Sequence, residues 1–396
     1  MADSASIWNS GADVVQRLRS DGHQAWLVGG CVRDRLLSRP LKDADVATSA
    51  EPHEVETLFP RTIAVGKAFG VIKVLPDDRT TGRPDDRTRG NEVEVASLRA
   101  DDRYVDGRRP VAIRRGTLQE DAERRDLTVN ALYADPDGTI TDPVGGLADV
   151  GARILRGIGD PAARLAEDRL RVLRVLRFAA VLGFAIEPAT AAAVRTTAID
   201  GVARERVLDE LSKAAHAGAA GAFLRGCVAH DQLAAVAPCA APDTAAVLLE
   251  RLGPVNLELA LAAWLLPGGT DAANAWMAMQ PLAAVSRRNV PWLIATAPRL
   301  GELAVAERRR ALRRPEGAAC AALAAAIDPA GARDYVRWAS QDSDPQPCPV
   351  GASDLLAAGV PQGPEVGRRL RLIEDAWLSG AATDRESLLA LHATTG

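Results

Sequence analysis

The strongest constraint on the fold of this chain is a change in its sequence pattern near residue 150. Before that point, short alternating or continuous apolar segments stand between Gly/Pro-bearing turns, a pattern typical of strands mixed with helices. After it, alanine, leucine and arginine predominate, and apolar residues recur at helical spacing between Pro/Gly breaks. We therefore predict an α+β fold, in which a head with a mixed sheet is followed by an all-α remainder.

The first part contains a series of strand candidates and two polar segments. The apolar runs predict strands over 24–28, 43–48, 62–66, 70–75 and 92–98. The segments 76–91 and 99–116 are charged and rich in turn residues, so we expect two mobile loops there. No internal repeat of fixed period is present.

The composition is that of a folded protein. Of the 396 residues, 47% are hydrophobic and 25% are charged, so the chain can bury a sizeable core. Its five cysteines are scattered and odd in number, which predicts reduced thiols in a cytoplasmic protein rather than disulfides or a zinc site. We expect no signal peptide and no membrane span. Because the formal net charge is -4, any contact with nucleic acid must come from local basic patches.

Three carboxylates occur in two of the strand candidates. Asp43 and Asp45 are two residues apart, so in a strand they project to the same face. Glu94 lies between valines, where a buried carboxylate is costly unless it binds a cation. Together the three fit two divalent ions about 3.5–4 Å apart. An Asp-x-Asp pair alone is more often a solvated turn, and Glu94 alone is equally explained as an edge-strand charge facing water.

A glycine pair and a basic residue precede these carboxylates. Gly29 and Gly30 leave the backbone free to approach a phosphate, and Arg33 can bridge phosphate oxygens. The alternative is a strand-ending turn followed by a local Arg33–Asp34 pair. Each of these features alone is weak evidence. Their order and spacing together favour a nucleoside triphosphate site.

The segment LVGGCVRDRLLSRPLKDADVATS resembles the signature of the class II tRNA nucleotidyltransferase and bacterial poly(A) polymerase family, which belongs to the DNA polymerase beta-like nucleotidyltransferases. Further segments resemble its other motifs in the same order, with Leu127 in place of the usual Phe: EVASLR, ERRDLTVNALY, TDPVGGLADV, AEDRLRVLRVLRF and ARERVLDEL. The resemblance covers about residues 24–215. It implies a nucleotidyltransferase head over 1–146, a helical neck over 147–215, a helical body over 216–328 and a helical tail over 329–396.

The resemblance also implies the site residues. Asp43 and Asp45 are expected to hold Mg²⁺, with Glu94 as the third catalytic carboxylate. The residues expected to bind the incoming nucleotide are Gly29, Gly30, Arg33, Asp34, Arg125, Asp168, Arg171, Arg174 and Arg177.

The pair Asp168 and Arg171 has a physical basis for reading a base. On a helix, residues three apart are neighbours on one face. A carboxylate offers acceptors and a guanidinium offers a fork of donors, which together can pair with the Watson–Crick edge of cytosine or adenine. The alternative is an amphipathic helix whose arginines pair with Asp160, Glu167 and Asp168.

The C-terminal half carries weaker signals. Two basic segments, AERRRALRR and GVPQGPEVGRRL, are candidates for contact with an RNA backbone or for solvated helix faces. We expect RNA contact at Arg308, Arg309, Arg310, Arg368 and Arg369, with tRNA as the partner and no required protein partner.

The resulting functional prediction is a template-independent RNA 3′-nucleotidyltransferase that adds CCA to tRNA from CTP and ATP and releases pyrophosphate. Three alternatives stay open: a poly(A) polymerase or an enzyme that adds only CC or only A, an RNA-binding protein whose head no longer turns over, and nucleotidyl transfer to a small molecule. We also predict that the loop 99–116 moves when CTP gives way to ATP.

Overall fold

The computed structural model describes residues 3–66, 71–75, 92–101, 113–341 and 346–391. The chain forms two compact units. One comprises Met1–Val202 with His230–Gln232, and the other comprises Ala203–Ala229 with Leu233–Gly396. The fold class is the predicted one: a head with a mixed sheet followed by a helical remainder. The predicted division into four domains stays a prediction.

Within the described residues, seven strands form the sheet of the first unit, in the order β3-β4-β5-β2-β1-β8-β9. The strands β2 and β5 run parallel, and the other neighbouring pairs run antiparallel. The strands are β1 (Ala25–Val28), β2 (Ala44–Thr48), β3 (Thr62–Gly66), β4 (Val71–Val74), β5 (Val93–Ser97), β8 (Tyr133–Ala134) and β9 (Ile140–Thr141).

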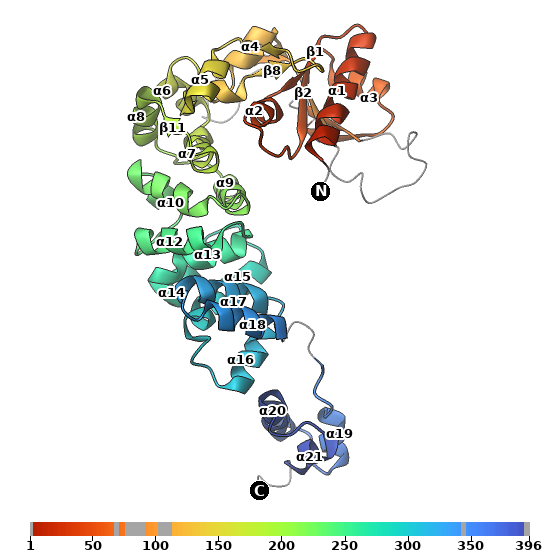
Figure 1. Ribbon diagram of the computed structural model, residues 1–396, viewed down its shortest axis with the longest axis vertical. Coiled ribbons are helices and arrows are strands. Elements are labelled where there is room, and N and C mark those ends of the chain that lie inside the picture. Colours follow the sequence, from red (N-terminus) through yellow and green to blue (C-terminus); the bar gives the residue numbers. More distant parts are fainter. Residues whose placement is uncertain (1–2, 67–70, 76–91, 102–112, 342–345, 392–396) are drawn as a thin grey trace. The chain divides into compact units, whose positions relative to one another are not determined.

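The helix α1 (Ser4–Ser20) covers one face of this sheet. Its buried residues include Ile7, Gly11, Val14 and Leu18, which recur at the three- to four-residue spacing of one helix face. Gly11 allows close approach, because a methyl group there would lie 2.7 Å from Leu27 Cδ2 and 3.0 Å from Ala44 Cβ. Figure 1 shows β1 and β2 between α1 and α2 (Gly30–Leu36).

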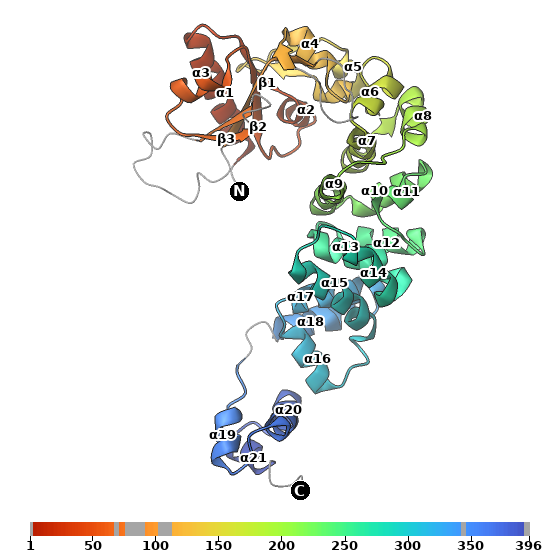
Figure 2. The same cartoon turned by 180° about the vertical axis from the view of Figure 1, so that it is seen from behind.

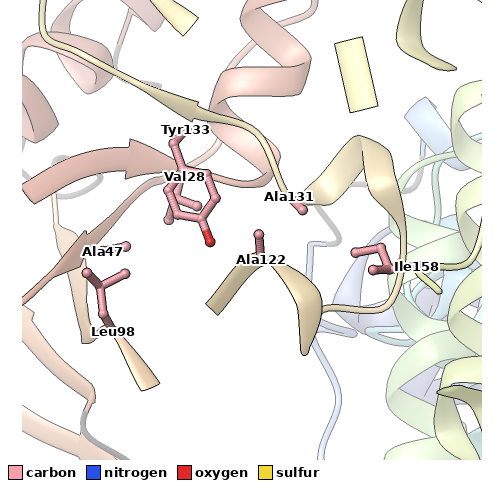
Figure 3. Close-up of a cluster of buried hydrophobic side chains, with 7 residues drawn as sticks. All are labelled: Val28, Ala47, Leu98, Ala122, Ala131, Tyr133 and Ile158. Atoms are coloured by element: carbon pink, nitrogen blue, oxygen red, sulfur yellow. The ribbon is translucent and has the colours of Figure 1, made fainter. Parts of the chain in front are cut away.

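The other face of the central strands packs on a second part of the core. Val28, Ala47, Leu98 and Tyr133 are buried there together with Ala122 (Figure 3). Side chains alternate along a strand, so Asp45, two residues before Ala47, emerges on this face and not on the face under α1. The sheet therefore places its acidic residues away from α1.

The remaining elements of the first unit lead from the sheet into helices. They are α3 (Pro52–Leu58), β6 (Arg99–Asp101), β7 (Ile113–Arg115), α4 (Leu118–Glu123), η4 (Thr128–Asn130), α5 (Gly146–Ala152), β10 (Ile154–Leu155), α6 (Pro161–Glu167), α7 (Leu170–Leu182), β11 (Ala185–Ile186) and α8 (Pro188–Thr196). The prediction of a loop over 99–116 was wrong at its two ends, because β6 and β7 pair there as antiparallel strands. Residues 102–112 and the predicted loop 76–91 lie outside the described residues.

The second unit is helical throughout its described residues, as the sequence predicts (Figure 2). Its elements are α9 (Arg204–His216), α10 (Ala220–Ala229), α11 (Leu233–Val236), α12 (Pro242–Leu252), α13 (Leu257–Leu265), η5 (Leu266–Gly268), α14 (Gly269–Ala278), α15 (Ala284–Thr296), η6 (Ala297–Arg299), α16 (Val305–Leu312), α17 (Gly317–Ile327), α18 (Ala332–Gln341), α19 (Ala352–Ala357), α20 (Pro364–Ser379) and α21 (Arg385–Ala390). Among the described helices, none combines the length and the apolar character that crossing a bilayer requires.

Candidate active site

The three predicted carboxylates lie at the parallel pair β2–β5. Asp45 and Glu94 are register partners, so their side chains emerge on the same face of the sheet. Asp43 directly precedes β2, which begins at Ala44, one residue later than predicted. Asp43 and Glu94 are exposed and Asp45 is half-buried. The pairing of β2 with β5 thus brings together residues that are about fifty positions apart in the sequence.

The electrostatics of this group leave it short of positive charge. Burial, followed by the charges of Asp43 and Glu94, raises the pKa of Asp45 to about 7, although Arg125 opposes this rise. Lys73 is the register partner of Glu94 on its other side, but its ammonium binds Glu92 at 2.8 Å. The negative charges around Asp45 are therefore incompletely compensated by protein side chains.

These residues fit a hard divalent cation. Carboxylate oxygens are the ligands that Mg²⁺ prefers, usually one or two of them together with water and substrate phosphates. A ready-made group of three or more His, Cys, Asp or Glu ligands is absent from the described residues. The donor set and its unbalanced charge therefore suit an ion that is shared between Asp45, its neighbours and a bound nucleotide.

The glycine pair forms a tight entry into α2. Gly29 has φ 76°, a conformation that favours glycine, and its N–H donates to the Leu132 carbonyl at 2.9 Å. A methyl group at Gly29 would lie 3.4 Å from Nη1 of Arg125, and one at Gly30 would lie 3.8 Å from Nη2 of Arg33. The backbone thus comes close to both arginines, as a phosphate cradle requires.

A buried polar chain connects α2 with α7. Arg33 is 5% exposed and donates to Asp34 at 2.9 Å and to the side-chain oxygen of Asn130. The Asn130 amide donates in turn to Asp126 at 3.1 Å. Asp126 then accepts a hydrogen bond from Nε of Arg174 at 2.7 Å and forms an ion pair with Nη2 of the same arginine, also at 2.7 Å. Two of the predicted nucleotide-binding arginines are therefore fixed through one asparagine.

Three arginines surround the ring of Phe178. The guanidinium carbons of Arg33, Arg174 and Arg177 lie 5.2, 5.5 and 4.1 Å from its centroid. An aromatic face attracts cations and orients them without neutralising them. Side chains from α2 and α7 thus concentrate positive charge at one place, which suits a polyanion such as a triphosphate.

Arg125 is held by a buried carboxylate on α4. Its Nη2 and Nε lie 3.0 and 3.2 Å from Oδ2 of Asp121, and its Nη1 donates to the Asn130 carbonyl at 3.3 Å. Burial disfavours the charged guanidinium, but Asp121 outweighs burial and the pKa of Arg125 is raised. Arg125 therefore stays fixed and charged beside the glycine turn.

The structure corrects the predicted geometry of the base-reading pair. The helix α6 ends at Glu167 and α7 begins at Leu170, so Asp168 lies between two helices instead of sharing a helix face with Arg171. One oxygen of Asp168 accepts a hydrogen bond from the Leu170 N–H at 3.2 Å, which favours an interruption of the helix at this point. The expectation of one continuous helix over this motif was wrong because the carboxylate bonds the backbone.

Arg171 pairs with Glu167 in this structure. Its Nη1 donates to Glu167 at 2.7 Å and to the Arg164 carbonyl at 2.9 Å, and its Nη2 donates to the Arg124 carbonyl at 2.9 Å. A guanidinium has five N–H donors, so two of those of Arg171 have no hydrogen-bond partner among the described residues. The ion pair of the alternative interpretation is present, yet it leaves donors for a base.

The five predicted RNA-contacting arginines all make contacts within the second unit. Arg368 and Arg369 pair with Glu365, and Arg310 pairs with Glu374 and Asp375. Arg309 donates to the Leu378 carbonyl at 2.7 Å, and the guanidinium carbon of Arg308 lies 3.8 Å from the centroid of the Trp338 ring. RNA contact by these residues stays a prediction, and any such contact has to use the donors that these partners leave over.

The predicted site residues do not include four residues that the structure places at the site: Asp121, Asp126, Asn130 and Phe178. All four fall inside or next to motifs that the resemblance had singled out, ERRDLTVNALY and AEDRLRVLRVLRF. Asp126 and Asn130 are buried, and Asp121 is 1% exposed. The signal was present in those motifs, but only the tertiary contacts show which arginines these residues hold.

The head matches a known family. Residues 25–156 match the sequence model of the poly A polymerase head domain. The CCA-adding enzyme of Bacillus velezensis is 44% identical over 182 residues, which are 46% of this chain and 43% of that enzyme. The CCA-adding enzyme of Anoxybacillus flavithermus is 42% identical over 204 residues, 50% of this chain and 48% of that enzyme. The matched part thus spans about half the length of these relatives.

The whole chain resembles solved structures. The crystal structure of the Bacillus stearothermophilus CCA-adding enzyme in complex with CTP aligns with a TM-score of 0.80 and 26% identity, covering 98% of this chain and 97% of that one. The Thermotoga maritima CCA-adding enzyme complexed with tRNA aligns with a TM-score of 0.67 over 99% and 98% of the two chains. Because its identity is 17%, this second likeness concerns the fold alone.

Proposed function

We propose, because residues 25–156 match the sequence model of the poly A polymerase head domain, that the chain is a template-independent RNA 3′-nucleotidyltransferase that completes the CCA end of tRNA. The substrates are CTP, ATP and a tRNA whose 3′ end is incomplete. The observation that carries the proposal is the placement of Asp45 and Glu94 on one face of the sheet. The arginines of α2 and α7 supply the matching positive charge around Phe178.

The reaction in this proposal is an in-line displacement at phosphorus. The 3′-hydroxyl oxygen of the RNA bonds to the α-phosphorus of the nucleotide, the bond to the β-phosphate breaks, and pyrophosphate leaves. Asp43 and Asp45 would hold Mg²⁺, with Glu94 beside them. When bound, the metal supplies activation of the attacking hydroxyl and stabilisation of the departing pyrophosphate.

The chain's own residues bind and orient the nucleotide in this scheme. The turn Gly29–Gly30 receives the triphosphate, and Arg33, Arg174 and Arg177 compensate its charge. Arg125 contacts the nucleotide next to the glycine turn. Asp168 and Arg171 read the base, with the spare donors of Arg171 facing acceptors on cytosine or adenine.

The proposal is tested with one tRNA transcribed in three forms that end before CCA, after C and after CC. Each form is incubated with Mg²⁺ and CTP, ATP or both, and the 3′ ends are sequenced. We expect addition that stops at CCA. Long A tails on any RNA would make the chain a poly(A) polymerase, and incorporation of only CC or only A would make it a partial enzyme.

A matched variant separates chemistry from binding. Asp43→Ala should abolish incorporation and leave the dissociation constant for the tRNA unchanged, because the variant removes a metal ligand and no RNA contact. Undiminished incorporation by Asp43→Ala would contradict the metal assignment. Incorporation into an aminoglycoside-type small molecule but not into RNA would contradict the substrate class.

A further inference from the structure

A single buried carboxylate, Asp121, connects the elements of the candidate site. It lies on α4, is 1% exposed, and accepts hydrogen bonds from three different side chains. Arg124 donates through Nε and Nη2 at 2.9 and 2.5 Å, Arg125 through Nε and Nη2 at 3.2 and 3.0 Å, and Tyr133 through its hydroxyl at 2.6 Å. One oxygen serves Arg124, and the other serves Arg125 and Tyr133.

Each of the two arginines leads to a different part of the candidate site. Nη1 of Arg125 lies beside the glycine turn, 3.4 Å from the position that a methyl group at Gly29 would occupy. The backbone carbonyl of Arg124 accepts a hydrogen bond from Nη2 of Arg171, one of the two predicted base-reading residues, at 2.9 Å. The phosphate side and the base side therefore both depend on the segment that Asp121 anchors.

The third partner fixes the carboxylate itself. The Tyr133 ring belongs to the buried cluster of Val28, Ala47 and Leu98, and its hydroxyl is directed toward the helix that carries Ala122 and Asp121 (Figure 3). Tyr133 is fully buried, so the hydrogen bond sets the position of Asp121 from the core side. The guanidinium of Arg125 also lies 5.5 Å from the centroid of the same ring.

The charge balance shows that Asp121 does more than fill the core. Two guanidinium groups share the Asp121 carboxylate, so Asp121, Arg124 and Arg125 together carry one positive charge, and the charge of Arg125 also acts on Asp45. A buried cluster with a surplus charge is costly unless a ligand completes it. The surplus lies next to the glycine turn, where an anionic nucleotide is the matching partner.

From this arrangement we propose that Asp121 is a positioning residue for nucleotide selection: it orients Arg125 toward the triphosphate and, through the Arg124 carbonyl, Arg171 toward the base. This inference rests on the proposed function and deepens it, because it assigns affinity and base choice to one residue that touches neither the nucleotide nor the metal. A carboxylate is required, since only its two oxygens can accept from two guanidinium groups and a hydroxyl at once.

The test uses Asp121→Asn in the full-length protein. Asparagine has nearly the same shape, but it replaces one acceptor oxygen by an amide NH2 group, whose hydrogens face a guanidinium donor. We expect the KM for CTP and ATP to rise about tenfold, which corresponds to about 1.4 kcal/mol, because a charge-assisted hydrogen bond to Arg125 or Arg124 is lost. The ratio of correct CTP to incorrect UTP incorporation should fall as well, whereas the dissociation constant for tRNA should not change.

Two controls separate positioning from stability. Tyr133→Phe removes one hydrogen bond to Asp121 and leaves both arginine contacts, so its KM should rise less than threefold. Leu18→Ala opens a cavity under α1, where the side chain is fully buried and does not belong to the buried cluster that contains Tyr133. The two variants are compared under conditions where Leu18→Ala and Asp121→Asn have lost the same unfolding free energy. If Leu18→Ala then shifts KM and base choice as much as Asp121→Asn does, the positioning role is overturned.

The outcome is independent of whether the proposed function survives. If the wild-type chain does not extend tRNA, the proposed function is contradicted. The effect of Asp121→Asn on the dissociation constant for CTP can still be measured by equilibrium dialysis. If the wild-type chain adds CCA and Asp121→Asn keeps the KM and the CTP to UTP ratio of the wild type, only the positioning role falls. Restoration by Asp121→Glu of most of the base choice would support the need for a carboxylate.

Discussion

Asp45 of β2 and Glu94 of β5 are register partners in parallel strands and share one face of the sheet. Burial, followed by repulsion from Asp43 and Glu94, raises the pKa of Asp45 and so disfavours its ionised form. A divalent cation reverses this imbalance. The first prediction concerns the stability that such a cation adds.

Saturating Mg²⁺ is expected to raise the Tm of the wild-type chain, and Asp45→Asn should lose most of that rise. A ligand present at about 100 times its dissociation constant adds about 2.7 kcal/mol to the unfolding free energy. The measurement is a thermal melt with and without Mg²⁺. Asp13→Asn on the exposed face of α1 is the control, and an equal Mg²⁺ response in Asp45→Asn would contradict the site.

The ion pair of Asp126 with Arg174 should make stability depend on pH in acid. Burial raises the pKa of Asp126, but Arg174 and Asn130 outweigh burial and hold it well below its usual range. Its stabilising contribution is therefore complete above the unfolded pKa near 4 and is lost as pH falls through the lower folded value. Urea denaturation from pH 7 to pH 3 measures this loss.

Asp126→Asn supplies the comparison for that pH series. Breaking a buried pair costs about 3–5 kcal/mol, and the lower end applies because the Arg174 side chain is 33% exposed. The difference between wild type and variant should be largest near pH 7 and should narrow below about pH 4. A difference in unfolding free energy that stays constant from pH 7 to pH 3 would show that the ionised carboxylate of Asp126 is not the source of the stabilisation.

Phe178 should contribute to nucleotide affinity through the arginines around it. Phe178→Leu keeps most of the volume and removes the ring face, and each cation–π contact is worth at least roughly 0.5–1 kcal/mol. We expect the KM for both nucleotides to rise about threefold to tenfold with little change in Tm. Phe184→Leu, a buried aromatic outside this cluster, is the matched control, and equal effects of the two variants would count against the cluster.

Gly29→Ala should impair incorporation beyond its cost in backbone strain. Gly29 and Gly138 both have positive φ, 76° and 93°, so alanine is strained at either position by roughly 1–3 kcal/mol. Only at Gly29 does the added methyl group reach an arginine, since nothing lies within 4 Å at Gly138. A comparison of the incorporation kinetics of Gly29→Ala and Gly138→Ala separates the effect of the Arg125 contact from that of backbone strain. Equal kinetics of the two variants would contradict a role for this contact in the site.

Much of the head could be predicted from the sequence because its motifs are local. The glycine pair, Arg33 and Asp45 lie within seventeen consecutive positions, and alternation along a strand already places Asp43 and Asp45 on one side. The path of the chain at Asp168 could not be read this way. Its carboxylate accepts from the Leu170 N–H and ends the helical run, and this competition between side chain and backbone is not visible in helical spacing.

The sequence alone determined which residue types are present and in what order: a strand-and-helix head with three carboxylates, a glycine turn and an arginine series, followed by a helical remainder. Only the tertiary structure decided which of them meet. The parallel pairing of β2 with β5 sets Glu94 beside Asp45, and the packing of α4, η4 and α7 joins Asp121, Asn130 and Arg171 to one site. The physical reason is range: periodicity and turn chemistry act over a few residues, whereas strand register and buried hydrogen bonds join residues far apart in the chain.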